Sequence, residues 1–305
     1  MHGVCVVDKP RGPTCQKVLN LFKRKFGKIK IGHSGTLDPF ATGVLPIFLG
    51  NATRLIPFIQ ENEKTYEATL QLGVKTDTFD DLGEILEERV VPHLTSEQIR
   101  KVFEKFLGKQ QQIPPLFSAV KIAGVPLYKK ARRGESVELK PRDVQIHSIE
   151  LIQFNLSQIQ FRTCVSKGTY IRRLAVDIAE QLGTIGHLIQ LKRIQTGPFD
   201  LKSVLTFSKD LQLEASKAEI KMHSLKTLAR LTQDRKWYDF ESEEAVLKHK
   251  QGQLISSSNL QVQGSQVWTR WKNEFVSVSE VIQEIGKEEL LLKPLRLIEL
   301  ELGCG

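Results

Sequence analysis

The sequence predicts an α+β protein whose strands are interleaved with helices, followed by a small β-rich part at the C-terminus. Apolar residues follow the strand period in some stretches and the helix period in others, and several strand-like stretches are neighbours, as in hairpins. The composition changes after Phe207, where a polar, helix-prone stretch precedes new strand-like runs. We therefore expect a large domain over residues 1–235 and a small one over 236–305.

The N-terminal part is expected to begin with a buried strand and a capped helix. Residues 3–7 are apolar, and the prolines that follow them cannot continue a ladder. Thr14 can cap a helix whose apolar residues fall on one face. Three glycines and a proline, with neither period, predict a loop over 31–43. After it we expect a strand over 44–49, a short helix over 52–59 and a strand over 65–72.

Further along the chain, Thr95 and Gln98 form a capping-box pattern ahead of a helix. A later helix over 169–182 carries Arg172 and Arg173 off its apolar stripe, so both arginines are free to face a cleft. The helix that begins after Thr95 is predicted to have an apolar stripe of Ile99, Val102, Phe103, Phe106 and Leu107. Strands are expected at Val144 to Leu151, with a change of phase after Ile146, and at Ile159 to Val165. In the C-terminal part we expect a helix over 242–250 and strands over 266–271, 275–278 and 291–300.

Charge is the first indication of function. Lys and Arg number 44 and Asp and Glu number 35, which gives a net charge of +9. Basic proteins are attracted to polyanions, because neutralised phosphates release counterions. The excess gathers in two runs, although each run alone could also be a solvated helix face. These runs are Lys23, Arg24, Lys25, Lys28 and Lys30, and then Lys121, Lys129, Lys130, Arg132, Arg133, Lys140 and Arg142.

Several classes of protein are disfavoured. The apolar stretches are too short to span a membrane, and the N-terminus lacks the pattern of a secretory signal, so we expect a cytoplasmic protein. The four cysteines are scattered, with no C-x-x-C pair and no histidine at ligand spacing. A disulfide framework and a structural zinc site are therefore not expected.

Asp38 is the only carboxylate in the glycine-rich loop over 31–43, which it shares with His33. An aspartate before a proline commonly bonds its own backbone in a turn. Taken alone, the loop therefore indicates a turn aspartate as readily as a functional one.

Other segments of the sequence also match motifs of a known family, in addition to this loop. Six segments resemble, in order, the motifs of the tRNA pseudouridine synthase B family over about residues 3 to 200. They begin at Lys9-Pro10, at Gly32-His33 (the signature loop, to Pro46), at Lys64-Thr65-Tyr66, at Thr76-Asp77, at Pro114-Pro115 and at Ser166-Lys167 (the arginine motif, to Arg172). One loop could match by coincidence, whereas six ordered matches indicate membership of the family.

The resemblance implies a pseudouridine synthase fold, with a mixed, mostly antiparallel central sheet flanked by helices and a small C-terminal domain of the PUA type. It implies isomerisation of uridine to pseudouridine at position 55 in the T-loop of tRNA, after the base has been flipped out of its stack. The reaction changes no oxidation state and needs no energy source, so no cofactor and no metal are expected. The expected partner is the T-arm and elbow of tRNA, and neither an obligate protein partner nor an oligomer is called for.

The resemblance also implies roles for single residues. Asp38 matches the nucleophile, and Arg172 matches the arginine that pairs with it and keeps it ionised. Tyr66 matches the tyrosine that stacks on the target base and is a candidate general base for proton loss from C5. Residues implied to bind substrate are His33, Lys9, Tyr170 and Leu191, together with the basic residues Lys129, Lys130, Arg132 and Arg133 of an RNA-gripping segment over about 115–143.

Two positions depart from the family pattern. Cys15 stands where a serine is usual, and Lys192 stands where an arginine is usual. Two other functions stay open at this point: an RNA-guided pseudouridine synthase, and a tRNA-folding chaperone that has lost the chemistry. The first usually carries a longer segment before its Lys-Pro motif, and the second would be expected to lack Asp38 or Arg172.

Overall fold

A computed structural model describes most of the chain. The described residues are 2–59, 63–118, 121–122, 125–127, 130, 133, 139–208, 236–256, 260, 264–272, 274–283 and 290–297. Residues 209–235, which hold most of the polar stretch expected to be helical, lie outside them.

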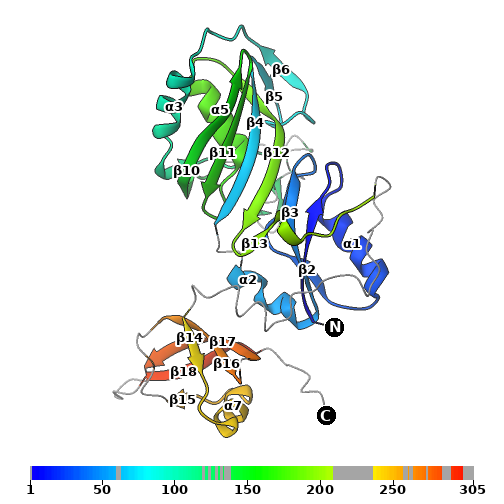
Figure 1. Ribbon diagram of the computed structural model, residues 1–305, viewed down its shortest axis with the longest axis vertical. Coiled ribbons are helices and arrows are strands. Elements are labelled where there is room, and N and C mark those ends of the chain that lie inside the picture. Colours follow the sequence, from blue (N-terminus) through cyan, green and yellow to red (C-terminus); the bar gives the residue numbers. More distant parts are fainter. Residues whose placement is uncertain are drawn as a thin grey trace.

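The larger part is built on a mixed sheet that has nine strands among the described residues (Figure 1). Its main order is β1-β3-β12-β4-β11-β10-β7, with β2 paired to β3 and β13 to β12. Neighbouring strands run antiparallel except β3 and β12, which pair in parallel. The strands are β1 (Gly3–Lys9), β2 (Ile31–His33), β3 (Thr42–Leu49), β4 (Lys64–Leu72), β7 (Gly108–Gln112), β10 (Arg142–Asn155), β11 (Gln158–Val165), β12 (Gly186–Thr196) and β13 (Phe199–Asp200). The predicted mixed, mostly antiparallel sheet is confirmed.

Helices pack against the sheet and bury its apolar side chains. α3 (Ser96–Glu104) and α5 (Ile171–Gln181) lie on one face of the β10, β11, β4 and β12 strands, and α1 (Cys15–Phe26) packs beside β2 (Figure 1). Burial of this apolar surface is the main favourable term in the stability of such a layer. The shorter elements are η1 (Gly50–Leu55), α2 (Ile56–Ile59), η2 (Leu201–Ser203), the hairpin of β5 (Val74–Thr76) and β6 (Ile85–Glu88), and the two-residue strands β8 (Lys121–Ile122) and β9 (Val125–Pro126).

The structure confirms the predicted helix caps and the predicted phase change in a strand, which all depend on residues close together in the sequence. Thr14 caps α1 by accepting from the Lys17 amide, and Thr95 and Gln98 form both halves of a capping box. The phase change in β10 is a real irregularity, because the register with β11 shifts between Ile146 and Ser148.

Two predictions were wrong in detail. The loop expected over 31–43 is shorter, since β2 takes its first three residues and β3 begins at Thr42. β2 pairs with β3 across that loop, a contact that has no periodic signal in so short a strand. Leu107 is 45% exposed because α3 ends at Glu104, before the helical stripe reaches it. Arg172 lies off the apolar stripe of α5, as predicted, and its side chain is buried.

The C-terminal part is β-rich, as predicted. Its sheet has the order β14-β16-β17-β18-β15, and α7 packs against β18 and β15. The elements are β14 (Trp237–Asp239), α7 (Glu243–Lys250), β15 (Ile255–Ser256), β16 (Gln266–Trp271), β17 (Glu274–Gln283) and β18 (Leu290–Leu297).

The two sheets are joined by an apolar cluster. Trp268 and Val278 of the small sheet belong to the same buried cluster as Val4 of β1 and Phe48 of β3. The opposite face of β1 and β3 packs into the main core, for example through Cys5 and Ile47. β1 and β3 are therefore buried on both faces, which explains why their sequences show no polar alternation.

In the described part of the chain, no helix combines the length and the apolar character that crossing a bilayer would need.

Candidate active site

A cavity of about 330 Å³ opens at the point where the loop between β2 and β3 meets β4, β12 and the start of α5. Its walls bring together five of the residues singled out from the sequence, which come from distant parts of the chain. They are Asp38, Tyr66, Tyr170, Arg172 and Leu191. The remaining wall is formed by Gly35, Thr36, Leu37, Lys64, Gly168, Thr169, Ile171 and Arg193.

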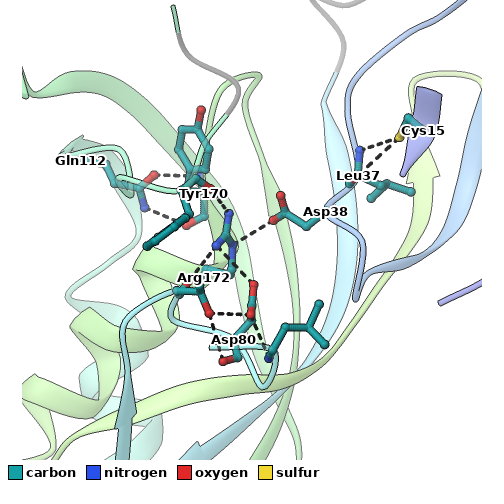
Figure 2. A network of polar contacts seen from close by, with 10 residues as sticks. Cys15, Leu37, Asp38, Asp80, Gln112, Tyr170 and Arg172 are labelled. Carbon is teal, nitrogen blue, oxygen red and sulfur yellow. Dashed lines mark hydrogen bonds and ion pairs between the residues drawn. The ribbon is translucent and has the colours of Figure 1, made fainter. Parts of the chain in front are cut away.

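Arg172 is the centre of a polar network in this cavity (Figure 2). Its Nε lies 2.9 Å from Oδ2 of Asp38, and its Nη1 lies 3.3 Å from Oδ2 of Asp80. The Nε–H bond does not point along the contact with Asp38, so this contact is an ion pair without an aligned hydrogen bond. The guanidinium is thus shared between two carboxylates.

Backbone carbonyls hold the same guanidinium from two further sides. Nη1 donates to the carbonyl of Thr78 at 2.6 Å, and Nη2 donates to the carbonyl of Phe117 at 2.8 Å. With only 3% of its side chain exposed, Arg172 is fixed by contacts rather than by solvent. A planar, permanently charged fork is suited to such a site, and a lysine could not make all four contacts.

The carboxylate of Asp38 is enclosed by protein, but 32% of its side chain is open to the cavity. Burial raises its pKa above the ordinary value of 3.8, the charge of Arg172 lowers it, Asp80 raises it, and Lys9 lowers it. The two cations therefore oppose the effect of burial and favour the ionised form. An exposed oxygen on an otherwise enclosed carboxylate is what a nucleophile in a recessed site requires.

Lys9 lies behind the loop that carries Asp38. It is fully buried, and its Nζ donates to the carbonyls of Pro10, Pro39 and Ala41 at 3.0, 3.3 and 2.7 Å. Burial lowers its pKa to about 8. Lys9 is not part of the cavity wall and lies under the loop, and its role in substrate binding stays a prediction.

Arg193 is a second buried cation at the same loop, and it was not among the predicted site residues. Its Nε donates to the carbonyl of Val44 at 2.8 Å, and its Nη2 donates to the carbonyl of Gly35 at 3.0 Å. These two carbonyls lie on either side of Asp38 in the chain. Gly43, at φ 103°, passes so close that a Cβ there would lie 2.2 Å from the Arg193 carbonyl oxygen. Glycine is thus required where β3 meets β12.

Cys15, one of the two departures from the family pattern, also holds this loop. Its Sγ accepts from the Leu37 amide at 3.2 Å and lies 3.4 Å from the Leu37 carbonyl (Figure 2). Burial raises the pKa of the thiol, so it stays protonated. A serine hydroxyl could make the same two contacts, so we expect the exchange of these near-isosteres to leave the loop in place.

Of the other predicted substrate-binding residues, Tyr170 and Leu191 line the cavity, whereas His33 does not. His33 ends β2 and faces Ile47 across the ladder. Burial lowers its pKa, and the nearby charge of Arg193 lowers it further, so the neutral imidazole is favoured. Burial also raises the pKa of the Tyr170 hydroxyl.

The predicted RNA-gripping segment is described only in part. Lys130 and Arg133 are among the described residues, and each makes an interaction within the protein. Lys129 and Arg132 lie outside the described residues, so their predicted role is a prediction still. Gln112 was not singled out, and Asp80 was noted only as part of a matched segment, because their contacts with Tyr170 and Arg172 join segments far apart in the sequence.

Similarity to known proteins agrees with this geometry. Residues 23–171 match the TruB family pseudouridylate synthase N-terminal domain, and residues 172–231 match the tRNA pseudouridylate synthase B C-terminal domain. The tRNA pseudouridine synthase B of Francisella philomiragia is 42% identical over 263 residues, which is 85% of each chain. The chain belongs to the tRNA pseudouridine synthase B family. Its relative in Geotalea uraniireducens is 47% identical over 206 residues, 68% of this chain and 66% of that one.

Solved structures support the fold of this family member independently. A chain from the crystal structure of a Cbf5-Nop10-Gar1 complex superposes with a TM-score of 0.71 at 22% identity, over 97% of this chain and 85% of that chain. A chain of an H/ACA RNP bound to a substrate RNA containing 2'-deoxyuridine gives a TM-score of 0.70 at 20% identity, over 98% and 85%. At this level of identity the match shows the pseudouridine synthase fold.

Proposed function

We propose that the protein isomerises uridine to pseudouridine at position 55 in the T-loop of tRNA, and that Asp38 is its nucleophile. The observation that carries the proposal is the ion pair of Asp38 with Arg172 at the wall of the cavity. The cavity volume of about 330 Å³ falls within the range of about 300–1,000 Å³ that is usual for small-molecule sites. A flipped nucleoside is a ligand of this size class.

The roles of the residues follow from their places. Asp38 attacks the nucleotide, the bond between the ribose and N1 breaks, and the base turns while it stays trapped. A bond from the ribose to C5 then forms, C5 loses its proton, N1 gains one, and Asp38 leaves unchanged. Arg172 keeps Asp38 ionised. Tyr66 and Leu191 line the cavity from the neighbouring strands β4 and β12 and are proposed as the stacking and apolar surfaces for the base, and Tyr66 is the candidate base for the C5 proton.

The substrate is proposed to be the T-arm of tRNA, held from outside the cavity. The net charge of +9 supports an RNA partner, and His33 is proposed to fill the space left by the flipped base. Replacing Lys129, Lys130, Arg132 and Arg133 together with glutamine should weaken tRNA binding. It should also flatten the dependence of binding on salt, because fewer counterions are released. An unchanged salt slope would exclude this segment as the clamp.

The proposal extends to the organisation of the protein. A catalytic domain over 1–235 would be followed by a small PUA-like RNA-binding domain over 236–305, and the small second sheet supports that division. The enzyme is proposed to act in the cytoplasm as a monomer without a guide RNA or an obligate protein partner.

The decisive experiment is release of tritium from a tRNA transcript labelled at C5 of uridine, with wild-type protein and Asp38→Asn in parallel. Wild type should release tritium and the variant should not, and a transcript with cytidine at the target position should release none. If both proteins bind tRNA tightly and neither releases tritium, the protein is a tRNA-folding chaperone or requires a guide RNA.

A further inference from the structure

Gln112 ends the edge strand β7 and is bonded to the backbone of Tyr170, the residue before α5 (Figure 2). The Tyr170 amide donates to Oε1 of Gln112 at 2.7 Å, and Nε2 of Gln112 donates to the Tyr170 carbonyl at 3.0 Å. Gln112 is only 6% exposed. Both hydrogen bonds are therefore shielded from water, and loss of the side chain would leave a buried amide without its partner.

The start of α5 has no cap of its own. Tyr170 occupies the N-cap position and its side chain makes no capping hydrogen bond, whereas Thr14 and Thr95 cap α1 and α3 in the usual way. Gln112 takes the place of a local cap, although it belongs to the strand β7 and not to the segment before α5. It holds the amide and the carbonyl of the N-cap residue itself, and so fixes the direction in which the helix begins.

Arg172 is the second residue of α5, so the place of its backbone depends on Tyr170. The Arg172 guanidinium reaches Asp38 at 2.9 Å in a site closed to solvent on the arginine side. In such a site a small displacement of the helix start changes the ion pair more than it would at a surface, because water cannot replace the lost contact.

We propose that Gln112 is a positioning residue for the reaction: by fixing the backbone of Tyr170, it holds Arg172 at the distance that keeps Asp38 ionised. The inference rests on the proposed role of Asp38 as the nucleophile. Gln112 touches neither the cavity nor any group that reacts.

The expected signature is a change in pH dependence. The charged groups that face Asp38 are Arg172 from α5, Asp80 from the β5–β6 turn and Lys9 from β1. If Arg172 withdraws, burial and Asp80 act on Asp38 with less opposition, and its pKa rises. Catalysis requires the ionised carboxylate, so the acid limb of the rate profile moves to higher pH.

The test is Gln112→Met, with Gln111→Met as the matched control. Gln111 is the neighbouring glutamine on β7 and is exposed. Single-turnover tritium release would be measured with excess enzyme from about pH 5 to about pH 8, beside tRNA binding and thermal unfolding. We expect Gln112→Met to lower the rate at neutral pH about tenfold or more, and to move the acid limb up by about half a pH unit or more. Its affinity for tRNA should stay unchanged, and Gln111→Met should behave as wild type.

An acid limb that stays in place in Gln112→Met would overturn the proposal, whatever the rate, because a purely structural role lowers activity equally at every pH. If Gln112→Met shows no cooperative unfolding, Gln112→Glu takes its place. That variant keeps an acceptor for the Tyr170 amide and lacks the donor to the carbonyl, so the same upward shift is expected and its absence is decisive. Failure of wild type itself to release tritium would overturn the proposed function first, which separates the two conclusions.

Discussion

Two regions of the molecule bury polar side chains, and they do so in opposite ways. Beside the cavity, the charged residues Lys9, Arg172 and Arg193 are enclosed by the large sheet and bond to backbone carbonyls. In the small sheet, His249 bonds to the hydroxyls of Ser277 and Ser279, and all three side chains are fully buried.

The difference lies in what the buried groups do for their surroundings. The polar groups of the neutral cluster bond mainly to one another: the hydroxyls of Ser277 and Ser279 are 2.6 Å apart, and that of Thr269 lies 2.8 Å from Ser277, while Nδ1 of His249 has no hydrogen-bond partner among the described residues. The cations fix the loop that presents the half-buried Asp38 to the cavity. A buried neutral network specifies packing, whereas buried charge is costly to desolvate and is retained here beside the proposed nucleophile.

The largest effect that would test this contrast is expected for Arg172→Met. The change leaves Asp38 and Asp80 without their shared guanidinium, so it should lower tritium release by at least about a thousandfold and cost about 3–5 kcal/mol of stability. Residual activity should require higher pH, because the pKa of Asp38 rises further. Arg173→Met is the control, since Arg173 pairs with Asp177 of the same helix. Equal losses in the two variants would show that any α5 arginine is equivalent.

Lys9→Met should lower the rate about ten- to a hundredfold, because three carbonyls under the loop lose their donor. The pKa of Lys9 in the folded protein is about 8, below its ordinary 10.5. Between these values the unfolded chain holds a proton that the folded protein has released. Wild-type stability should therefore rise with pH by about 3 kcal/mol over this window, and Lys9→Met should lack the rise.

Denaturant unfolding from pH 8 to 10.5 checks that expectation. Lys17→Met, an exposed lysine on α1, is the control and should follow wild type. A wild-type curve parallel to that of Lys9→Met would mean that Lys9 keeps its proton throughout.

His249→Gln tests the neutral cluster of the small sheet. Burial lowers the pKa of His249 from 6.5 to about 4, so the unfolded chain takes up a proton first as the pH falls. Wild type should lose about 2–3 kcal/mol of stability through this window on acidification, and His249→Gln should not. Tritium release at neutral pH should be unaffected. The exposed His93 provides the control His93→Gln, and a loss of catalysis in His249→Gln alone would end the distinction between the regions.

The smallest effect is expected for Cys15→Ser, a neutral group inside the charged region. The hydroxyl can keep both contacts with Leu37, so the rate should stay within about twofold of wild type. Cys15→Ala removes both contacts and should lower the rate several-fold more than Cys15→Ser. Single-turnover rates measure both, and equal rates would mean that Lys9 and Arg193 hold the loop without help from residue 15.

The sequence predicted features whose causes lie close together in the chain. The caps at Thr14 and Thr95 and the bulge after Ile146 are local, and each was visible in the pattern of residues. The pairing of Asp38 with Arg172 was found through resemblance, because no pattern links positions so far apart.

What the sequence could not provide was the backbone chemistry of the site. The carbonyls that receive Lys9 and Arg193 carry no residue signal, since every residue has one. The bonds of Gln112 to Tyr170 depend on β7 lying beside the start of α5, which only the sheet order reveals. The exposed Leu107 shows the reverse case, in which a strong helical stripe continued past the end of its helix.

The apolar cluster shared by the two sheets has a consequence for how this chain could have been shortened or recombined. Val4 and Phe48 pack in one buried cluster with Trp268 and Val278. Strand β1 of the large sheet therefore also forms part of the surface on which the small sheet packs. A chain cut before β14 would leave an apolar face of β1 and β3 exposed to solvent and would tend to aggregate. The small sheet therefore cannot be removed without consequence. A truncated chain would also need polar substitutions in β1 and β3, which lie near the opposite end of the chain.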